Sequence, residues 1–163
     1  MAASELSAQL WKERELLELL LFKLEEEQLL LIAGKSRWIS HATREVEQVM
    51  ERMREAGLAR TVEAAVVAEL WGLEPDASLR QLAAAAPDGI WSDIFGSHLA
   101  AMTELTGQFA EVRDTNERLL REAARSTQET LSGLGGGPSD AGVYGSGGES
   151  RSDSGARLFD TEA

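Results

Sequence analysis

The chain contains no cysteine and only two histidines among its 163 residues. Without cysteine, disulfides, thiol nucleophiles and thiolate metal ligands are all excluded, which fits a reducing cytoplasm. A helical di-iron site requires glutamate three residues before each histidine, but Trp38 and Phe95 stand at those positions before His41 and His98. We therefore predict no metal and no cofactor, and we expect both histidines to be structural or surface residues.

Positive charge is also scarce, because 16 Lys and Arg face 28 Asp and Glu and give a net charge of −12. Binding to a nucleic-acid backbone or to anionic lipid needs a basic surface, so neither is expected. An acidic protein of this kind suits a partner with a basic or aggregation-prone surface.

No long uncharged hydrophobic run is present. The most apolar stretch, LLELLLFKLEEEQLLLIAG, is interrupted by Glu18, Lys23 and the acids at 25–27, whereas a bilayer span needs about twenty mostly uncharged residues. We read it as an amphipathic helix and predict no membrane insertion. The opening MAASELSAQLWKERE has early acids and no apolar core, so no signal peptide is predicted and the expected location is cytoplasmic.

Alternating strand patterns are absent too, and helical periodicity dominates. A first helix is predicted from about Ser4, as its cap, to Ala33, with leucines on so broad a face that it requires more than one neighbour. Gly34 ends it, and Ser36 caps a second helix that Gly57 ends. The alternative, one helix continuous through Gly34, stays open.

Three further helices are predicted after Gly57. A short one covers about 61–71, and a brief one, capped by Asp76 or Ser78, reaches Ala85. The last begins near 88–91 and reaches about Leu131, a length of roughly 60 Å. The predicted fold is therefore all-α, an elongated antiparallel bundle of coiled-coil type whose core comes from the first, second and last helices.

The last helix carries apolar residues at alternating steps of three and four, interrupted by one polar residue, Asn116. The positions are Leu105, Phe109, Val112, Asn116, Leu119 and Ala123. A polar residue in such a seam fixes the register of neighbouring helices. The alternative is that Asn116 contacts a partner helix.

Composition changes sharply at Leu131, where a Gly/Ser-rich segment begins. We predict a helical domain over 1–132 and a disordered tail over 133–163, because the tail has too few apolar residues to fold alone. Two apolar islands interrupt the tail, one around Tyr144 and one at Leu158 and Phe159. They are candidates for ordering on a partner, although undirected composition explains them equally well.

No constellation of residues indicates catalysis. The consecutive acids at 25–27 point in three directions around a helix, so they cannot converge on one site. The glycines at 135–137 precede Pro138 and lack the strand and helix that a phosphate-binding loop requires. We therefore predict that the protein is not an enzyme.

Four segments taken in order resemble the FlgN family of flagellar export chaperones. They are LLELLLFKLEEEQLLLIAGKSRWI, SLRQLAAAAPDGIW, VRDTNERLLREA and VYGSGG. In the third, Asn116, Leu119 and Leu120 match the family pattern, but the second asparagine that the family often shows is missing near Arg118.

The resemblance implies a cytoplasmic chaperone that holds hook-associated proteins of the hook–filament junction and delivers them to the flagellar type III export gate. It would cover the amphipathic C-terminal helices of these cargo proteins before assembly. Which junction protein is the cargo is not determined, and a homodimer is left open. The alternative is a coiled-coil adaptor or self-associating structural protein with no export role. The candidate partner-binding residues are Asn116, Leu119, Leu120, Ala123, Tyr144, Leu158 and Phe159, with Tyr144 facing either cargo or gate.

Overall fold

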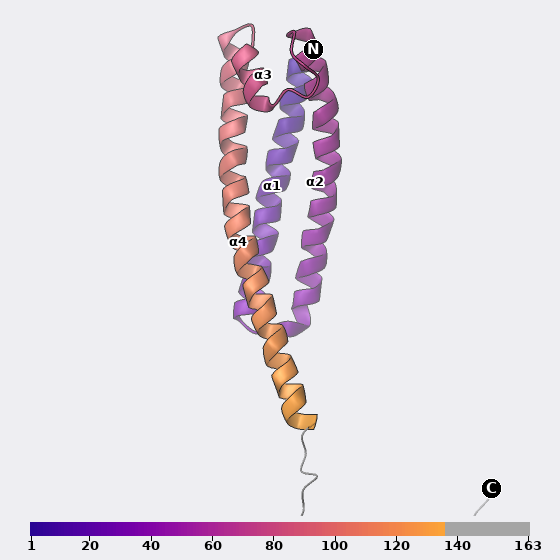
Figure 1. The fold of residues 1–163 in the computed structure, drawn as a ribbon, viewed down its shortest axis with the longest axis vertical. Helices are drawn as coiled ribbons and strands as arrows, with labels where there is room; N and C mark the ends of the chain where they lie inside the picture. The colour runs from indigo at the N-terminus through magenta and orange to yellow at the C-terminus, as the bar shows by residue number, and fades with distance from the viewer. Residues whose placement is uncertain (136–163) are drawn as a thin grey trace, which may run out of the picture.

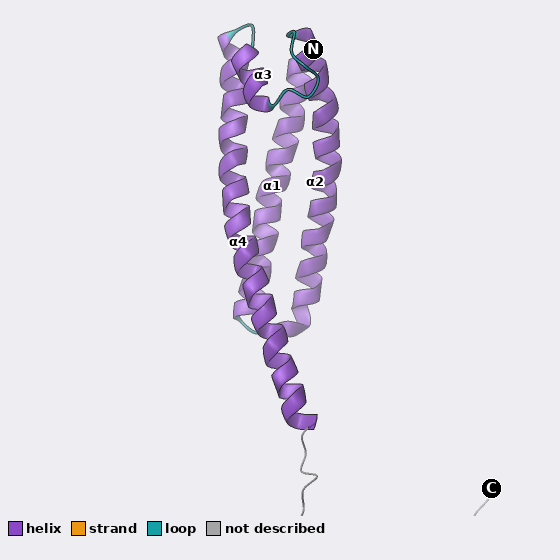
Figure 2. Cartoon of the chain, in the orientation of Figure 1, coloured by secondary structure: helices purple, strands orange, loops and turns teal. Residues whose placement is uncertain are grey.

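The computed structural model describes residues 1–135, which form four helices. In chain order they are α1 (Ala2–Ile32), α2 (Ser36–Leu70), α3 (Leu79–Ala85) and α4 (Gly89–Gly135). Short loops join the helices, and no strand occurs within 1–135 (Figure 2). The predicted all-α class is confirmed. None of these helices combines the length and apolarity that are needed to cross a lipid bilayer.

The three long helices form a narrow rod (Figure 1). The direction of α2 is opposite to that of α1 and α4, and α1 packs against both of them. No Cα of α2 lies within 8 Å of a Cα of α4. Helix α1 is therefore the shared neighbour that holds the other two, as its broad leucine face predicts. Helix α3 packs on α4 at the end that carries Met1, called the proximal end here.

Two apolar clusters fill the rod. The proximal cluster joins all four helices through Leu6, Leu10, Val67, Ala68, Leu82 and Phe95. Farther along, a second cluster contains Leu20, Leu24, Val46 and Val49, and Phe109 and Val112 of α4 pack against it. These side chains span the space between α2 and α4, so the predicted core of three long helices is observed.

The turn between α1 and α2 lies at Gly34, which has φ +64°. This left-handed conformation suits glycine and ends α1, so the continuous alternative is excluded. Ser36 is the first residue of α2 rather than its cap, which is Lys35. Met1 likewise precedes α1, and the Ser4 hydroxyl donates to the Met1 carbonyl instead of capping the helix.

The predicted end of the second helix at Gly57 is wrong, because α2 continues without interruption to Leu70. The predicted short helix over 61–71 is therefore the second half of α2. At Gly57, α1 approaches α2 closely. A Cβ at 57 would lie 3.4 Å from Oε1 of Glu13, a buried residue whose Oε2 lies 2.8 Å from Arg60 Nε.

The start of α3 follows the prediction that Ser78 caps it. Gln81 N donates to Ser78 Oγ at 3.3 Å, and Ser78 N donates to Gln81 Oε1 at 2.8 Å, which is a capping box. At the start of α4, the backbone N–H of Trp91 donates to Asp88 Oδ1 at 3.0 Å. Helix α4 ends at Gly135, a full turn beyond the expected Leu131.

Candidate functional site

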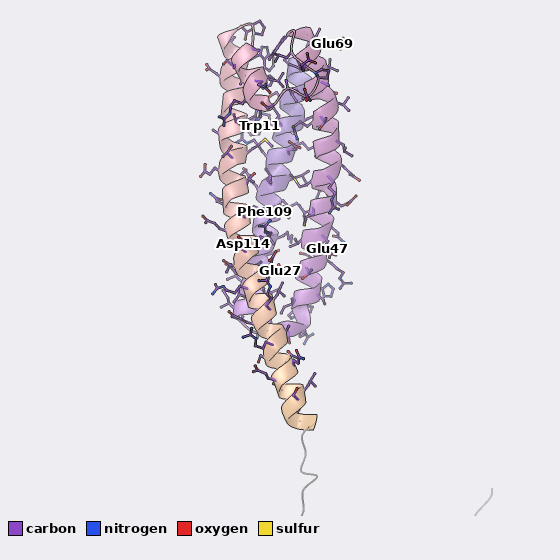
Figure 3. The ribbon with its side chains drawn as sticks, viewed as in Figure 1. Trp11, Glu27, Glu47, Glu69, Phe109 and Asp114 are labelled. Carbon is purple, nitrogen blue, oxygen red and sulfur yellow. The ribbon has the colours of Figure 1, made fainter. Side chains whose placement is uncertain are left out.

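A buried polar bridge joins the three long helices near the end opposite α3, called the distal end here. The Asn116 amide Nδ2 donates to the Leu24 carbonyl at 2.8 Å and to Glu27 Oε2 at 3.1 Å. The Thr43 hydroxyl donates to Glu27 Oε1 at 2.6 Å. Figure 3 shows Glu27 beside the part of α4 that carries Asp114. One carboxylate of α1 thus accepts hydrogen bonds from both α2 and α4.

The bridge sets the position of α4 along α1. Asn116 is only 2% exposed and Glu27 4%, and a buried polar group is costly unless it is hydrogen-bonded. Sliding α4 by one turn would separate Asn116 from Glu27 and leave both groups in an apolar surrounding. This placement favours the interpretation of Asn116 as a register-fixing residue, and contact with a partner helix remains a prediction.

Immediately after the bridge, α4 loses its neighbours. Leu119 and Leu120 are half-buried, but every residue from Arg121 to Gly135 is exposed, including Ala123. The reason is length, since α1 ends at Ile32 while α4 continues past the α1–α2 turn (Figure 1). We call residues 121–135 the α4 extension. Its apolar side chains Leu131 and Leu134 are also exposed, so no helix within residues 1–135 covers this part of the apolar seam of α4.

The α1–α2 turn adds more exposed apolar surface at the distal end. Leu29, Ile32 and Trp38 are all exposed. Leu29, Leu30, Trp38 and Ala42 line a shallow pocket of about 390 Å³. Sequence reasoning did not single out these residues, although the breadth of the leucine face on α1 was the signal that part of it would lack a partner.

Two acids, Glu26 and Glu45, line the same pocket. Lys23 Nζ lies 2.8 Å from a carboxylate oxygen of each. The hydrogen bonds to Glu26 and Glu45 raise the pKa of Lys23, and the hydrogen bond from Lys23 lowers the pKa of Glu45. The pairing holds α1 and α2 together from outside and places charged groups beside the exposed Leu29.

His41 lines the pocket at the α1–α2 turn, whereas His98 lies apart from it. His98 is buried at the proximal half, where Nε2 is 3.2 Å from the Ser7 hydroxyl and the ring meets Trp11 edge-on. Burial lowers the pKa of His98, and the charge of Arg14 lowers it further. His41 is exposed, 3.3 Å from Arg44. Within residues 1–135, no group of three or more His, Asp or Glu side chains is arranged to hold a metal ion.

The remaining predicted site residues, Tyr144, Leu158 and Phe159, lie outside the described part of the chain. Of the others, the structure brings Asn116, Leu119, Leu120 and Ala123 together on one face of α4 at the distal end. They span the transition from the buried bridge to the exposed extension.

A family model described as FlgN protein matches residues 1–152 of the chain. The chain belongs to the FlgN family. FlgN proteins form a family of flagellar export chaperones, and this is the broad role of the chain. Neither a curated protein nor a solved structure gave a significant match.

The FlgN match spans every helix described above and reaches into the tail. Tyr144 falls inside the matched residues, whereas Leu158 and Phe159 fall beyond them. In this FlgN-family chain, the segment VRDTNERLLREA carries the resemblance most clearly. It begins about two and a half turns before the α4 extension and contains Asn116 of the bridge.

Proposed function

We propose that this FlgN-family protein works in the cytoplasm as a chaperone for hook-associated proteins, whose C-terminal amphipathic helices it binds at the distal end. It prevents their premature association and delivers them to the flagellar type III export gate. The single observation that carries this proposal is the α4 extension, where an apolar helical seam continues beyond the helices that cover it.

The seam suits a helix as its partner. Leu119 and Leu120 are half-buried at the edge of the bundle, and Ala123, Leu131 and Leu134 follow on the extension. An amphipathic helix that lies along this seam would bury leucines on both sides, as in other helix-in-groove complexes. Ile32, the last residue of α1, is exposed as well.

Cargo binding would also stabilise the extension itself. Most of the stability of a helix in a protein comes from tertiary packing of an amphipathic face, and every residue of the extension is exposed within the described structure. Packing against a cargo helix supplies that contact, so ordering of the extension and protection of the cargo are coupled. The strength of this coupling depends on the seam residues and not on the outer face of α4.

Leu120→Asp tests the seam, because it places a charge where the cargo helix would pack. Arg118→Ser is the matched control, since it changes the net charge by the same single unit on the same turn at an exposed position. We expect Leu120→Asp to keep most of the helicity and to weaken binding of a hook-associated protein about tenfold or more in calorimetry, about 1.4 kcal/mol. Arg118→Ser should bind normally.

Equal affinity of the two variants would refute a cargo site on this seam. Analytical ultracentrifugation of the free protein distinguishes the adaptor alternative. A stable self-association that Leu120→Asp abolishes, without any binding of hook-associated proteins, would favour a self-associating structural protein over the chaperone.

A further inference from the structure

The face of α2 that points away from the bundle changes character halfway along the helix. Its first half carries charged residues, among them Arg44, Glu47 and Glu51. Its second half carries Leu58, Val62, Val66 and Leu70, which we call the α2 stripe. Figure 3 labels Glu47 in the first half and Glu69 near the end that adjoins α3. The stripe rises about 18 Å from Leu58 to Leu70, a span of thirteen residues.

All four side chains of the α2 stripe are exposed, Leu58 to 72%, Val62 to 64%, Val66 to 43% and Leu70 to 69%. The buried residues Ala56, Val67 and Ala68 lie on the opposite side of the same helix. Valine lowers helix propensity relative to most alternatives, and at an exposed position no packing compensates for it. The stripe therefore does not serve the stability of the monomer described here.

The charges around the α2 stripe are acidic. Residues 55–69 contain three acids and one cation, Arg60. Arg60 points inward to the buried carboxylate of Glu13, 2.8 Å away, so it does not offset the acids outside. Glu55 and Glu69 stand at the two ends of the stripe, and neither forms an ion pair within residues 1–135.

This charge pattern disfavours two occupants that the chain itself offers. In a symmetric antiparallel pair with Val62 against Val62, Glu55 of one copy would oppose Glu69 of the other. Residues 136–163 contain five acids against two arginines, so the tail would also bring like charge to the stripe. Like charges opposed across such a contact are unfavourable.

We propose that the α2 stripe is a second docking surface, which binds a basic amphipathic helix of another protein. The apolar face of that helix covers Leu58, Val62 and Val66, and Lys or Arg side chains on its flanks pair with Glu55 and Glu69. The stripe lies towards the proximal end and shares no residue with the α4 extension, so both surfaces can be occupied together.

A synthetic helical peptide of about 18 residues tests the proposal. Its leucines are spaced by three and four, lysines flank them, and a second peptide carries glutamates in place of the lysines. Fluorescence anisotropy with the full-length protein should show the lysine peptide binding about tenfold more tightly or better, with an affinity that weakens as salt is added. Equal binding of both peptides would overturn the charge argument.

Substitutions distinguish binding of the peptide at the α2 stripe from nonspecific attraction of the peptide to an acidic protein. Leu58→Gln with Val62→Gln leaves the net charge unchanged and should weaken the lysine peptide about tenfold. The matched control is Phe22→Gln with Ile90→Gln, at positions that are 53% and 68% exposed and belong to neither docking surface, and it should leave the affinity unchanged. Glu55→Gln with Glu69→Gln should weaken binding independently of the apolar substitutions.

If Leu58→Gln with Val62→Gln leaves the affinity for the lysine peptide unchanged, or if the control substitutions weaken it equally, the stripe is not the docking surface. Sedimentation of the free protein gives the other decisive result. A dimer that Leu58→Gln with Val62→Gln dissociates would show that a second copy covers the stripe, and would overturn the proposal of a basic helical partner.

Discussion

Glu13 of α1 lies directly against Gly57 of α2, where a Cβ would stand 3.4 Å from the carboxylate Oε1. The carboxylate is buried, and its other oxygen lies 2.8 Å from Arg60 Nε. Glycine at 57 thus leaves room for an ion pair between α1 and α2 in which Glu13 is buried and the Arg60 side chain is 36% exposed. Displacing Arg60 would leave the buried Glu13 carboxylate uncompensated, which costs more than the net stabilisation of the pair implies.

Substitutions at Gly57 should separate helix propensity from packing. Gly57→Ala should raise the free energy of unfolding by about 0.5–1 kcal/mol, because alanine favours the helix and its methyl group reaches only contact distance. Gly57→Val should lower it, because the branched side chain displaces the Glu13 carboxylate. Urea denaturation measures both. A valine variant as stable as the alanine variant would mean that the space beside Glu13 is open.

The bridge at the distal end predicts energetic coupling between α2 and α4. Asn116→Ala should destabilise the protein by about 1–3 kcal/mol, because Glu27 and the Leu24 carbonyl lose a buried donor. Thr43→Val removes the other donor to Glu27. Combined, the two changes should deviate from additivity, because both act through one carboxylate. Denaturation of the two single variants and the double variant measures this, and simple additivity would show that the two contacts are independent.

His98 should make stability depend on pH. Its pKa is lowered by burial below the ordinary 6.5, so the unfolded chain binds the proton more readily than the folded protein does. The contribution of His98 to the free energy of unfolding is therefore fully present above about pH 6.5 and decreases as the pH falls below that value. We expect the free energy of unfolding to decrease between about pH 7 and pH 5.5, and His98→Gln to flatten that decrease.

The control for this pH dependence is His41→Gln, because the imidazole of His41 is exposed to solvent. Its pH profile should follow that of the unaltered protein. The assignment to His98 fails if its glutamine variant keeps the full decrease in stability on acidification.

Tyr144 remains a prediction from the sequence, as a contact to cargo or to the export gate. It is the one tyrosine of the chain, in a segment of Gly, Ser and Asp, and an aromatic side chain buries a large area at small entropic cost. Tyr144→Ala should leave the melting temperature unchanged and reduce secretion of hook-associated proteins in cells. Normal secretion and motility would leave Leu158 and Phe159 as the tail candidates.

Local signals allowed most helix boundaries to be predicted, and tertiary contacts explain the exceptions. Gly34 and Ser78 act within a few residues of themselves, so the turn and the cap follow from the sequence. Gly57 looks like Gly34 in sequence, but its role depends on Glu13, more than forty positions away. The residues around Gly57 in the sequence carry no signal of this close approach, because it arises from how α1 packs on α2.

The candidate site was predictable to a similar degree. The seam spacing indicated which residues of α4 share a face, and Asn116 stood out as its polar interruption. The seam did not indicate at which residue the other helices stop covering α4. That point depends on the register in which Asn116 meets Leu24 and Glu27. Likewise, the sequence did not distinguish the residues of the α2 stripe from the apolar residues that face the core, because only the structure shows that they point outward.

The attachment of α4 to α1 also has a topological consequence. Thr43 and Glu27, which join α1 to α2, are 16 positions apart, whereas Asn116 and Leu24 are 92 apart. Contacts between distant positions carry a larger loop-closure entropy and dominate the contact order of a fold. The contacts within the α1–α2 hairpin are therefore the short-range ones. Most of the loop-closure entropy is lost when α4 packs on α1, and α4 is also the helix whose end extends beyond the bundle into solvent.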